Sequence, residues 1–210
     1  MATKYSLAEQ ALRIISGGPI SKDSDTSIRE VMLVIGQARD YLIRTEIFQL
    51  MMAGAGVDIP GEYISEYEGI KVSYDKTKKI FYSDLPATYI VLPRDRGVYQ
   101  VYRAEELHNP FVPVPTQFSG LYSGLGGSQL EGRDSYYVKK NRIYYPGMQK
   151  ASAPKSISIE LIVASSEIDD EDELFPIPAD KEMQVIQSAI QLLMTQKQIL
   201  NDKVNDNNGA

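Results

Sequence analysis

The chain has 210 residues, of which 43% are hydrophobic and 24% are charged, so it can bury the core of an ordinary soluble domain. Its formal net charge of −6 excludes the overall basic excess of a protein that coats nucleic acid, and the absence of cysteine excludes disulfides and thiolate chemistry. No apolar run approaches the ~18 residues of a membrane span, and the N-terminus lacks the apolar core of a signal peptide.

Residues 1–56 are predicted to form a helical N-terminal part that begins with a short helix. Ser6-Leu7-Ala8-Glu9 matches a capping box, in which the Ser6 hydroxyl accepts from the Glu9 amide. Gly17-Gly18-Pro19 is expected to end this helix. The spacing places four apolar residues on its packed face: Leu7, Ala11, Ile14 and Ile15.

A longer helix is predicted from about residue 27 to about residue 53. Ser27-Ile28-Arg29-Glu30 is a second capping box, and apolar residues then recur at helical spacing as far as Leu50. A helix of this length is ~40 Å long. It is suited to the wall of an oligomer, but an ordinary helical hairpin explains it equally well.

Residues 57–165 are predicted to be rich in β-strands and turns. Hairpins are expected at 70–86, at 87–104 with Pro93–Gly97 as the turn, and at 135–147, followed by a strand in SISIELIVAS. The intervening segment, about 104–134, is rich in Pro and Gly and too long for a simple connector, so we expect an extended arm.

The C-terminal part is predicted to contain an acidic and proline-rich linker, a helix and a flexible tail, at 166–178, 179–201 and 202–210. Six of the seven residues from Glu167 to Glu173 are acidic, and the rest of the chain has 22 acidic and 22 basic residues. The helix is amphipathic, and part of its apolar stripe is a predicted assembly interface. The residues of that interface are Met183, Ile186, Ile190 and Leu193.

The residue types that commonly act in catalysis or ligand binding do not form a recognisable catalytic motif in this chain. His108 is the sole histidine, and Gly120–Gly127 fits no phosphate-binding loop. The acidic run lacks the spacing of a calcium loop and is interpreted as a solvated linker or a contact for a basic partner. We therefore predict no catalytic residue, no cofactor and no metal site.

Tyrosine is the prominent aromatic residue, with 14 copies against 5 phenylalanines and no tryptophan. Twelve of the tyrosines lie between Tyr63 and Tyr145, in the predicted strands. Half-exposed strand faces and protein contacts both suit tyrosine, because its ring is apolar and its tip is polar. Stacking on nucleic acid bases is the alternative, and the lack of excess positive charge argues against it.

These elements predict an α+β fold in a single domain, 1–210. N-terminal helices, one of them long, and a C-terminal amphipathic helix would pack on a central antiparallel β-sheet or barrel with long loops.

The C-terminal third resembles a known class of virion protein. NRIYYPG, SISIELIVAS, DELFPIPADKEMQVIQSAIQLLM and the Asn- and Asp-rich end are similar to ring or head-to-tail adaptor (connector) proteins of crAss-like and related tailed phages, the podoviruses. The long N-terminal helix is compatible with that class. No catalytic motif belongs to the resemblance.

The resemblance implies a structural, non-enzymatic protein that forms a homo-oligomeric ring, commonly of twelve copies. The ring would bind the portal protein and neighbouring tail or ring proteins around a channel through which genomic DNA passes without specific binding. It would be part of the virion after assembly in the host bacterial cytoplasm, with no membrane contact. Two other functions stay open, namely a small carboxylate-dependent hydrolase and a monomeric partner-binding module.

Overall fold

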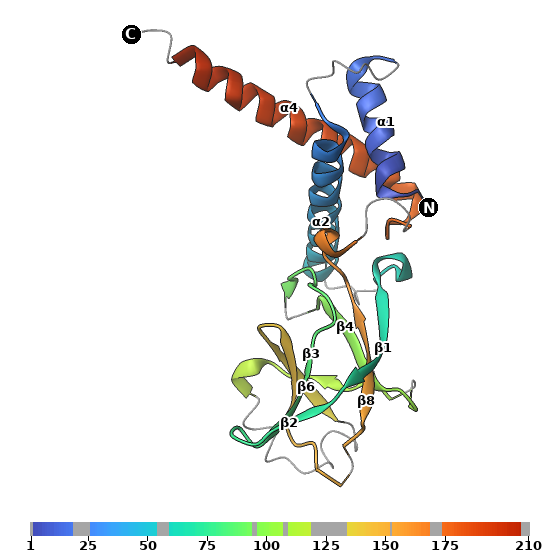
Figure 1. Ribbon diagram of the computed structural model, residues 1–210, viewed down its shortest axis with the longest axis vertical. Coiled ribbons are helices and arrows are strands. Elements are labelled where there is room, and N and C mark those ends of the chain that lie inside the picture. Colours follow the sequence, from blue (N-terminus) through green and yellow to red (C-terminus); the bar gives the residue numbers. More distant parts are fainter. Residues whose placement is uncertain are drawn as a thin grey trace. The chain divides into compact units, whose positions relative to one another are not determined.

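The computed structural model describes residues 2–18, 26–53, 59–93, 96–106, 109–118, 134–151, 153–168 and 174–206, with side chains as far as residue 196. The chain divides into two compact units (Figure 1). A helical unit comprises Met1–Tyr63 and Ala164–Ala210, and a β unit comprises Ile64–Val163. The predicted α+β class is confirmed. Whether the two units fold as one domain stays a prediction.

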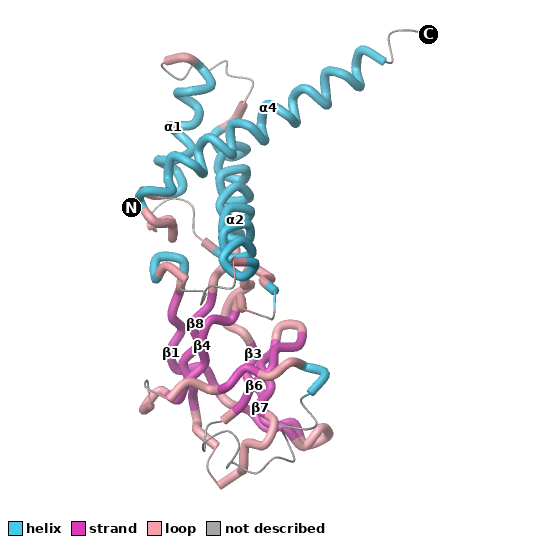
Figure 2. Tube along the Cα trace, turned by 180° about the vertical axis from the view of Figure 1, so that it is seen from behind, coloured by secondary structure: helices cyan, strands magenta, loops and turns pink. Residues whose placement is uncertain are grey.

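The described α-helices of the helical unit are α1 (Lys4–Ser16), α2 (Ile28–Met52) and α4 (Glu182–Asp206). α4 packs against both α2 and α1, and α1 packs against α2. The C-terminal half of α4 extends beyond the other two helices (Figures 1 and 2). The helices share a core of small and branched apolar side chains. It includes Leu7, Ala8, Ala11, Val31, Ile35, Ala38, Ile186, Ala189 and Leu193.

The two N-terminal helices begin at side-chain caps, one of which the sequence prediction misplaced. Ser27 caps α2 as predicted, and its hydroxyl accepts from the Glu30 amide at 3.2 Å. α1 begins earlier than predicted, because Thr3 is its cap and accepts from the Ser6 amide. The extended backbone that a cap requires is held at Thr3 by a β-bridge to Leu174, a partner distant in sequence.

The ends of the predicted helices also need correction. α1 ends at Gly17, as predicted, with a positive φ of 65° that suits glycine. Ile14, predicted on the packed face of α1, is 53% exposed. Ala179–Lys181 forms a 3-10 turn before α4, and α4 continues to Asp206, through much of the segment predicted as a flexible tail.

Two sheets make up the β unit. The first has the order β1 (Ser65–Lys71), β8 (Ser156–Leu161) and β4 (Val98–Arg103), and β8 is antiparallel to both neighbours. The second has five strands in the order β2-β3-β7-β6-β5, and only β5 and β6 pair in parallel. Its strands are β2 (Ser73–Asp75), β3 (Ile80–Asp84), β7 (Arg142–Tyr145), β6 (Ser135–Lys139) and β5 (Val112–Pro113). The described strands form open sheets and no closed barrel, which corrects the barrel alternative.

Two of the three predicted hairpins are confirmed. β2 and β3 form the first, and β6 and β7 form the last. The hairpin predicted at 87–104 is wrong, because both of its arms hydrogen-bond to Ile162. The Ile90 amide donates to the Ile162 carbonyl at 2.8 Å, and the Ile162 amide donates to the Gly97 carbonyl at 2.9 Å. The hydrogen bonds that the two arms would exchange therefore go to the segment after β8.

Part of the predicted arm at 104–134 belongs to the second sheet. Phe111 and Val114 are buried, and the Val114 amide donates to the Tyr136 carbonyl at 2.8 Å. Pro113 fits here because β5 is an edge strand, where the missing amide breaks no ladder. Residues 107–108 and 119–133 of the arm lie outside the described residues. Among the described helices, none is long and apolar enough to cross a membrane.

Candidate functional site

The predicted assembly stripe on α4 divides into a buried and an exposed part. Ile186 and Leu193 are buried in the core of the helical unit, Ile190 is half-buried, and Met183 is 52% exposed. α1 and α2 cover the buried side, which sequence periodicity alone does not reveal. Two of the four residues therefore contribute to the core of the helical unit. A test of assembly should instead target side chains that are exposed to solvent in the single chain.

Such side chains lie on α2. Four large apolar residues of this helix are between 53% and 74% exposed. Helical geometry of ~100° per residue places all four within an arc of ~100°, while the core residues of α2 lie on another side. We call this surface the α2 stripe, and it consists of Leu33, Tyr41, Phe48 and Met52.

The α2 stripe was missed because sequence analysis assigned one packed face to the helix. The available signal was that α2 has apolar residues on two sides. A helix that is apolar around much of its circumference is typically covered by partners on more than one side. Among the described residues of this unit, α1 and α4 pack against α2, and the four large apolar side chains stay exposed.

A buried cation fixes the entry to α4. Arg39 of α2 is fully buried, and its Nε donates to the Pro176 carbonyl at 2.9 Å. Its Nη1 donates to Asp40 at 3.0 Å, and the guanidinium lies 5.6 Å from the centre of the Phe175 ring. Burial lowers the pKa of Arg39 below its usual value, and Asp40 opposes that shift. The extended Phe175–Pro176 segment therefore has one defined position on α2.

Two further polar contacts join α2 to the segments before and after the β unit. Asp40 accepts from the Ser165 hydroxyl at 3.0 Å and from the Ser165 amide at 3.2 Å. Glu46 accepts from the Tyr63 hydroxyl at 3.1 Å and pairs with Lys181 at 3.3 Å. Burial, followed by the charge of Glu46, raises the pKa of Tyr63. Polar side chains of α2 thus bind the segments at Tyr63, Ser165 and Lys181, while the side chains of the α2 stripe stay exposed.

The β unit contains a pair of facing carboxylates. Glu66 of β1 and Glu160 of β8 are direct cross-strand partners. The Tyr102 hydroxyl of β4 donates to Glu66 and lies 3.4 Å from Glu160. Burial, followed by the charge of Glu66, raises the pKa of Glu160. Such a pair can share a proton, which is a property of general acid–base sites and also of strained structural pairs.

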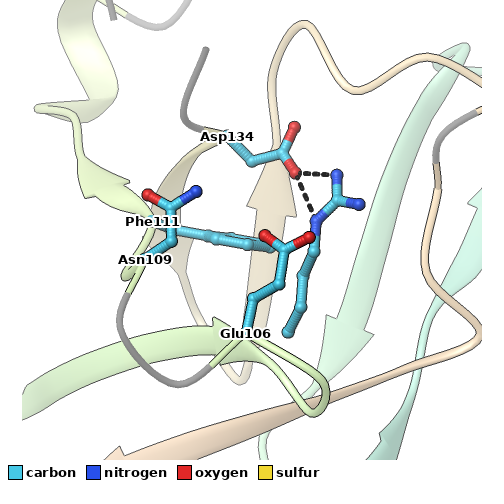
Figure 3. A pocket seen from close by; sticks show the side chains of 5 residues that line it. Glu106, Asn109, Phe111 and Asp134 are labelled. Atoms are coloured by element: carbon cyan, nitrogen blue, oxygen red, sulfur yellow. Dashed lines mark hydrogen bonds and ion pairs between the residues drawn. The ribbon is translucent and has the colours of Figure 1, made fainter. Parts of the chain in front are cut away.

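A small polar pocket of about 160 Å³ lies elsewhere in the β unit. Asp134 accepts hydrogen bonds from both Nε and Nη2 of Arg103, and Glu106, Asn109 and Phe111 complete the lining (Figure 3). Neither Glu66 nor Glu160 lines this pocket. The described residues contain no group of three or more acidic or histidine side chains that could hold a metal ion.

Three features that the sequence singled out lie outside the described residues. They are His108, the Gly120–Gly127 segment, and the acidic run from Asp169 to Glu173. Of that run, the structure describes Glu167, at the end of a 3-10 helix over Ser165–Glu167.

No protein-family model matches the sequence, and no curated protein is significantly similar to it.

Proposed function

We propose that this protein is a homo-oligomeric structural subunit, a ring component of the head-to-tail connector of a tailed phage. The observation that carries the proposal is the α2 stripe, where four large apolar side chains stand exposed along one helix. Exposed apolar surface gathered on one side of a helix is unfavourable in water and marks interaction sites. A second copy of the chain is the occupant that the proposal assigns to it.

The composition of the stripe supports a protein partner. Tyr, Phe and Met are enriched in protein interfaces, and Arg44, which is exposed on the same side of α2, is also of an enriched type. Exposed Leu192 and Met194 add apolar surface to α4. Both surfaces are on helices, and rigid elements hold an interface more precisely than loops.

The finer parts of the proposal rest on the resemblance of the C-terminal third to connector proteins. They are a ring of about twelve copies, contact with the portal and neighbouring tail proteins, and a channel for the genome. An acidic chain suits such a channel, because like charge keeps DNA from adhering to the wall.

The mass of the purified protein in solution tests the proposal, measured by light scattering after size exclusion with and without a portal protein. The wild type is expected to form a closed oligomer alone or with the portal. Phe48→Glu places a charge in the α2 stripe and should weaken association about 30-fold or more, the effect of losing a ~2 kcal/mol interface residue.

A matched control lies one residue away. Gln49 is also exposed on α2 but outside the stripe, so Gln49→Glu adds the same charge to the same helix and should leave the mass unchanged. A wild type that stays monomeric with every virion protein would contradict the proposal and favour a partner-binding module. Equal masses for the wild type and Phe48→Glu would remove α2 from the interface.

A carboxylate-dependent hydrolase is the second candidate function, because the pKa of Glu160 is raised beside a second carboxylate. The test is turnover of ester, phosphoester and glycoside substrates by the wild type and by Glu160→Gln. Activity that the variant loses at unchanged stability would establish this function in place of the first.

A further inference from the structure

The positive charge of the chain is concentrated on two adjacent hairpins of the β unit. Residues 73–84 and 135–145 carry six basic and two acidic side chains, a net charge of +4 in a chain whose total is −6. β3 and β7 pair with each other, so the two hairpins form one continuous sheet. The two hairpins therefore carry a local basic surface, which the overall negative charge of the chain conceals. The basic residues are Lys76, Lys78, Lys79, Lys139, Lys140 and Arg142.

Tyrosines and cations share the outward face of this sheet. Tyr144 pairs in register with Tyr82 on one side and with Tyr137 on the other, which makes a row of three tyrosines across the strands. Arg142 and Lys139 form part of the next row on the same face. The opposite face is buried, with Ser83, Val138 and Ile143 in the core, and on the outward face Tyr144 is itself only 7% exposed between its neighbours. We call the outward surface the basic tyrosine face.

The tyrosine rings on this face are already engaged. Tyr137 and Tyr144 stack with centroids 5.2 Å apart and an interplanar angle of 15°. Lys78 Nζ lies 5.3 Å from the centre of the Tyr144 ring, and the Arg142 guanidinium lies 4.7 Å from that of Tyr82. Stacking on bases requires open ring faces, so this arrangement disfavours it.

What the face presents to a partner is positive charge. The side chains of Lys78 and Arg142 are 59% and 45% exposed, and Lys139 is exposed beside them. Asp84 binds Arg142 at 2.7 Å, but the two hairpins keep their net excess of four positive charges. Lysine and arginine side chains that a rigid sheet keeps in place are suited to bind a ligand with several carboxylates.

We propose that the basic tyrosine face binds the acidic run Glu167–Glu173 of a second copy of this chain. The run has six carboxylates in seven positions and is the chain's most concentrated negative charge. Complementary patches of this kind set the register and the association rate of a protein interface. This inference rests on the proposed oligomer and adds a second, electrostatic contact to the α2 stripe. A single-stranded nucleic acid is disfavoured by the engaged rings and by repulsion from the acidic run.

A charge-swap experiment on the full chain tests this contact. The face-reversed variant carries Lys78→Glu and Lys139→Glu, and the run-reversed variant carries Asp170→Lys and Asp172→Lys. Each alone should associate at least about tenfold more weakly than the wild type, because the substitutions remove the net positive charge of the face or most of the negative charge of the run. An equimolar mixture of the two should regain association, since the unchanged face of the run-reversed variant then meets the unchanged run of the face-reversed variant. Lys71→Glu with Lys155→Glu is the control, because it changes the same charge at exposed positions elsewhere in the β unit.

The outcomes separate this inference from the proposed function. A wild-type oligomer whose mass none of the charge reversals changes would overturn the acidic-run contact and leave the structural function standing. A wild type that is monomeric with and without the portal would overturn both. Fluorescence anisotropy with a labelled single-stranded oligonucleotide completes the test. Binding that is lost only in the face-reversed variant, with unchanged self-association, would assign the face to nucleic acid and overturn the proposal. Circular dichroism establishes that each variant is folded.

Discussion

The helical unit and the β unit each contain a partly or wholly buried charge, and the two units compensate for it in opposite ways. In the helical unit, Arg39 is fully buried, but a carbonyl, a carboxylate and an aromatic ring surround its guanidinium. In the β unit, the strand register sets Glu66 against Glu160, and one tyrosine hydroxyl serves both carboxylates. Burial is costly for Arg39 and, to a smaller extent, for the half-buried Glu160, and the compensation differs.

The difference shows what makes a buried charge useful to a fold. Arg39 contacts groups from two segments far apart in sequence, so its removal would leave the entry to α4 without a fixed position. The carboxylate pair keeps two like charges together, so its removal would relieve repulsion. We therefore expect charge removal to destabilise the helical unit and to stabilise the β unit.

The largest effect is expected for Arg39→Ala. Removing one partner of a buried ion pair typically costs ~3–5 kcal/mol, because it leaves the other groups buried and unpaired. Urea unfolding followed by circular dichroism at the helix band measures the loss. Tyrosine fluorescence reports mainly the β unit, where 11 of the 14 tyrosines lie, so the two probes show which unit is affected.

Arg44→Ala is the matched control for this prediction, because it removes an exposed arginine from the same helix. It should change the free energy of unfolding by no more than ~0.5 kcal/mol. Equal stabilities for the two variants would show that the buried Arg39 side chain makes no net contribution to stability.

Two glycines give a second comparison between the units. A methyl group on Gly97 would overlap the Ile90 carbonyl oxygen, which is a backbone atom held by the sheet. Gly97→Ala should therefore cost ~1–3 kcal/mol as an overpacking change. A methyl group on Gly36 of α2 would lie 2.8 Å from the Ser165 hydroxyl oxygen, which can rotate, and 2.9 Å from the Ser165 Cβ, which can move only with its backbone.

The smaller effect is expected at Gly36. Gly36→Ala gains up to ~1 kcal/mol of helix propensity, but it loses the Ser165–Asp40 hydrogen bond and displaces Ser165, so we expect a net loss smaller than that of Gly97→Ala. Gly61→Ala is the control, since no atom lies within 4 Å of its new methyl group. Thermal unfolding of the three variants ranks them, and a Gly36 variant less stable than the Gly97 variant would contradict the assignment.

Features set by neighbours in sequence could be predicted, and features set by distant segments could not. The Ser27 cap and the two confirmed hairpins each depend on residues a few positions apart. The error at 87–104 arose because Ile162, far along the chain, takes the hydrogen bonds of both arms. The cap at Thr3 likewise depends on Leu174.

The candidate surfaces show the same division. Periodicity predicted an apolar stripe on α4, but only the packing of α1 and α2 decides that Ile186 and Leu193 belong to the core. The α2 stripe could have been predicted from the apolar residues on a second side of the helix. The basic tyrosine face was hidden because total charge averages over its hairpins, which are separated by some 50 residues of sequence. Cross-strand pairs such as Glu66 and Glu160 depend on register, which no local pattern specifies.

A small gain in stability is expected from Glu160→Gln. Burial and then Glu66 raise the pKa of Glu160 in the folded chain, so the folded state binds this proton more tightly than the unfolded state. Its stabilising contribution is complete below the unfolded pKa of ~4.3 and is lost as the pH rises through the folded pKa. Glutamine carries no charge at any pH and still accepts from Tyr102. The variant should be ~0.2–1 kcal/mol more stable at neutral pH, and this advantage should shrink as the pH falls toward ~4.

Urea unfolding across that pH range, followed by tyrosine fluorescence, measures the difference between the variant and the wild type. Glu68→Gln removes the same charge from an exposed position on β1 and should change the stability by no more than ~0.5 kcal/mol. A variant less stable than the wild type at neutral pH would mean that the Tyr102 hydrogen bond needs the charged carboxylate. In that case the pair would hold β1, β8 and β4 together in the way that Arg39 holds α2 to the entry of α4, and the contrast between the two units would disappear.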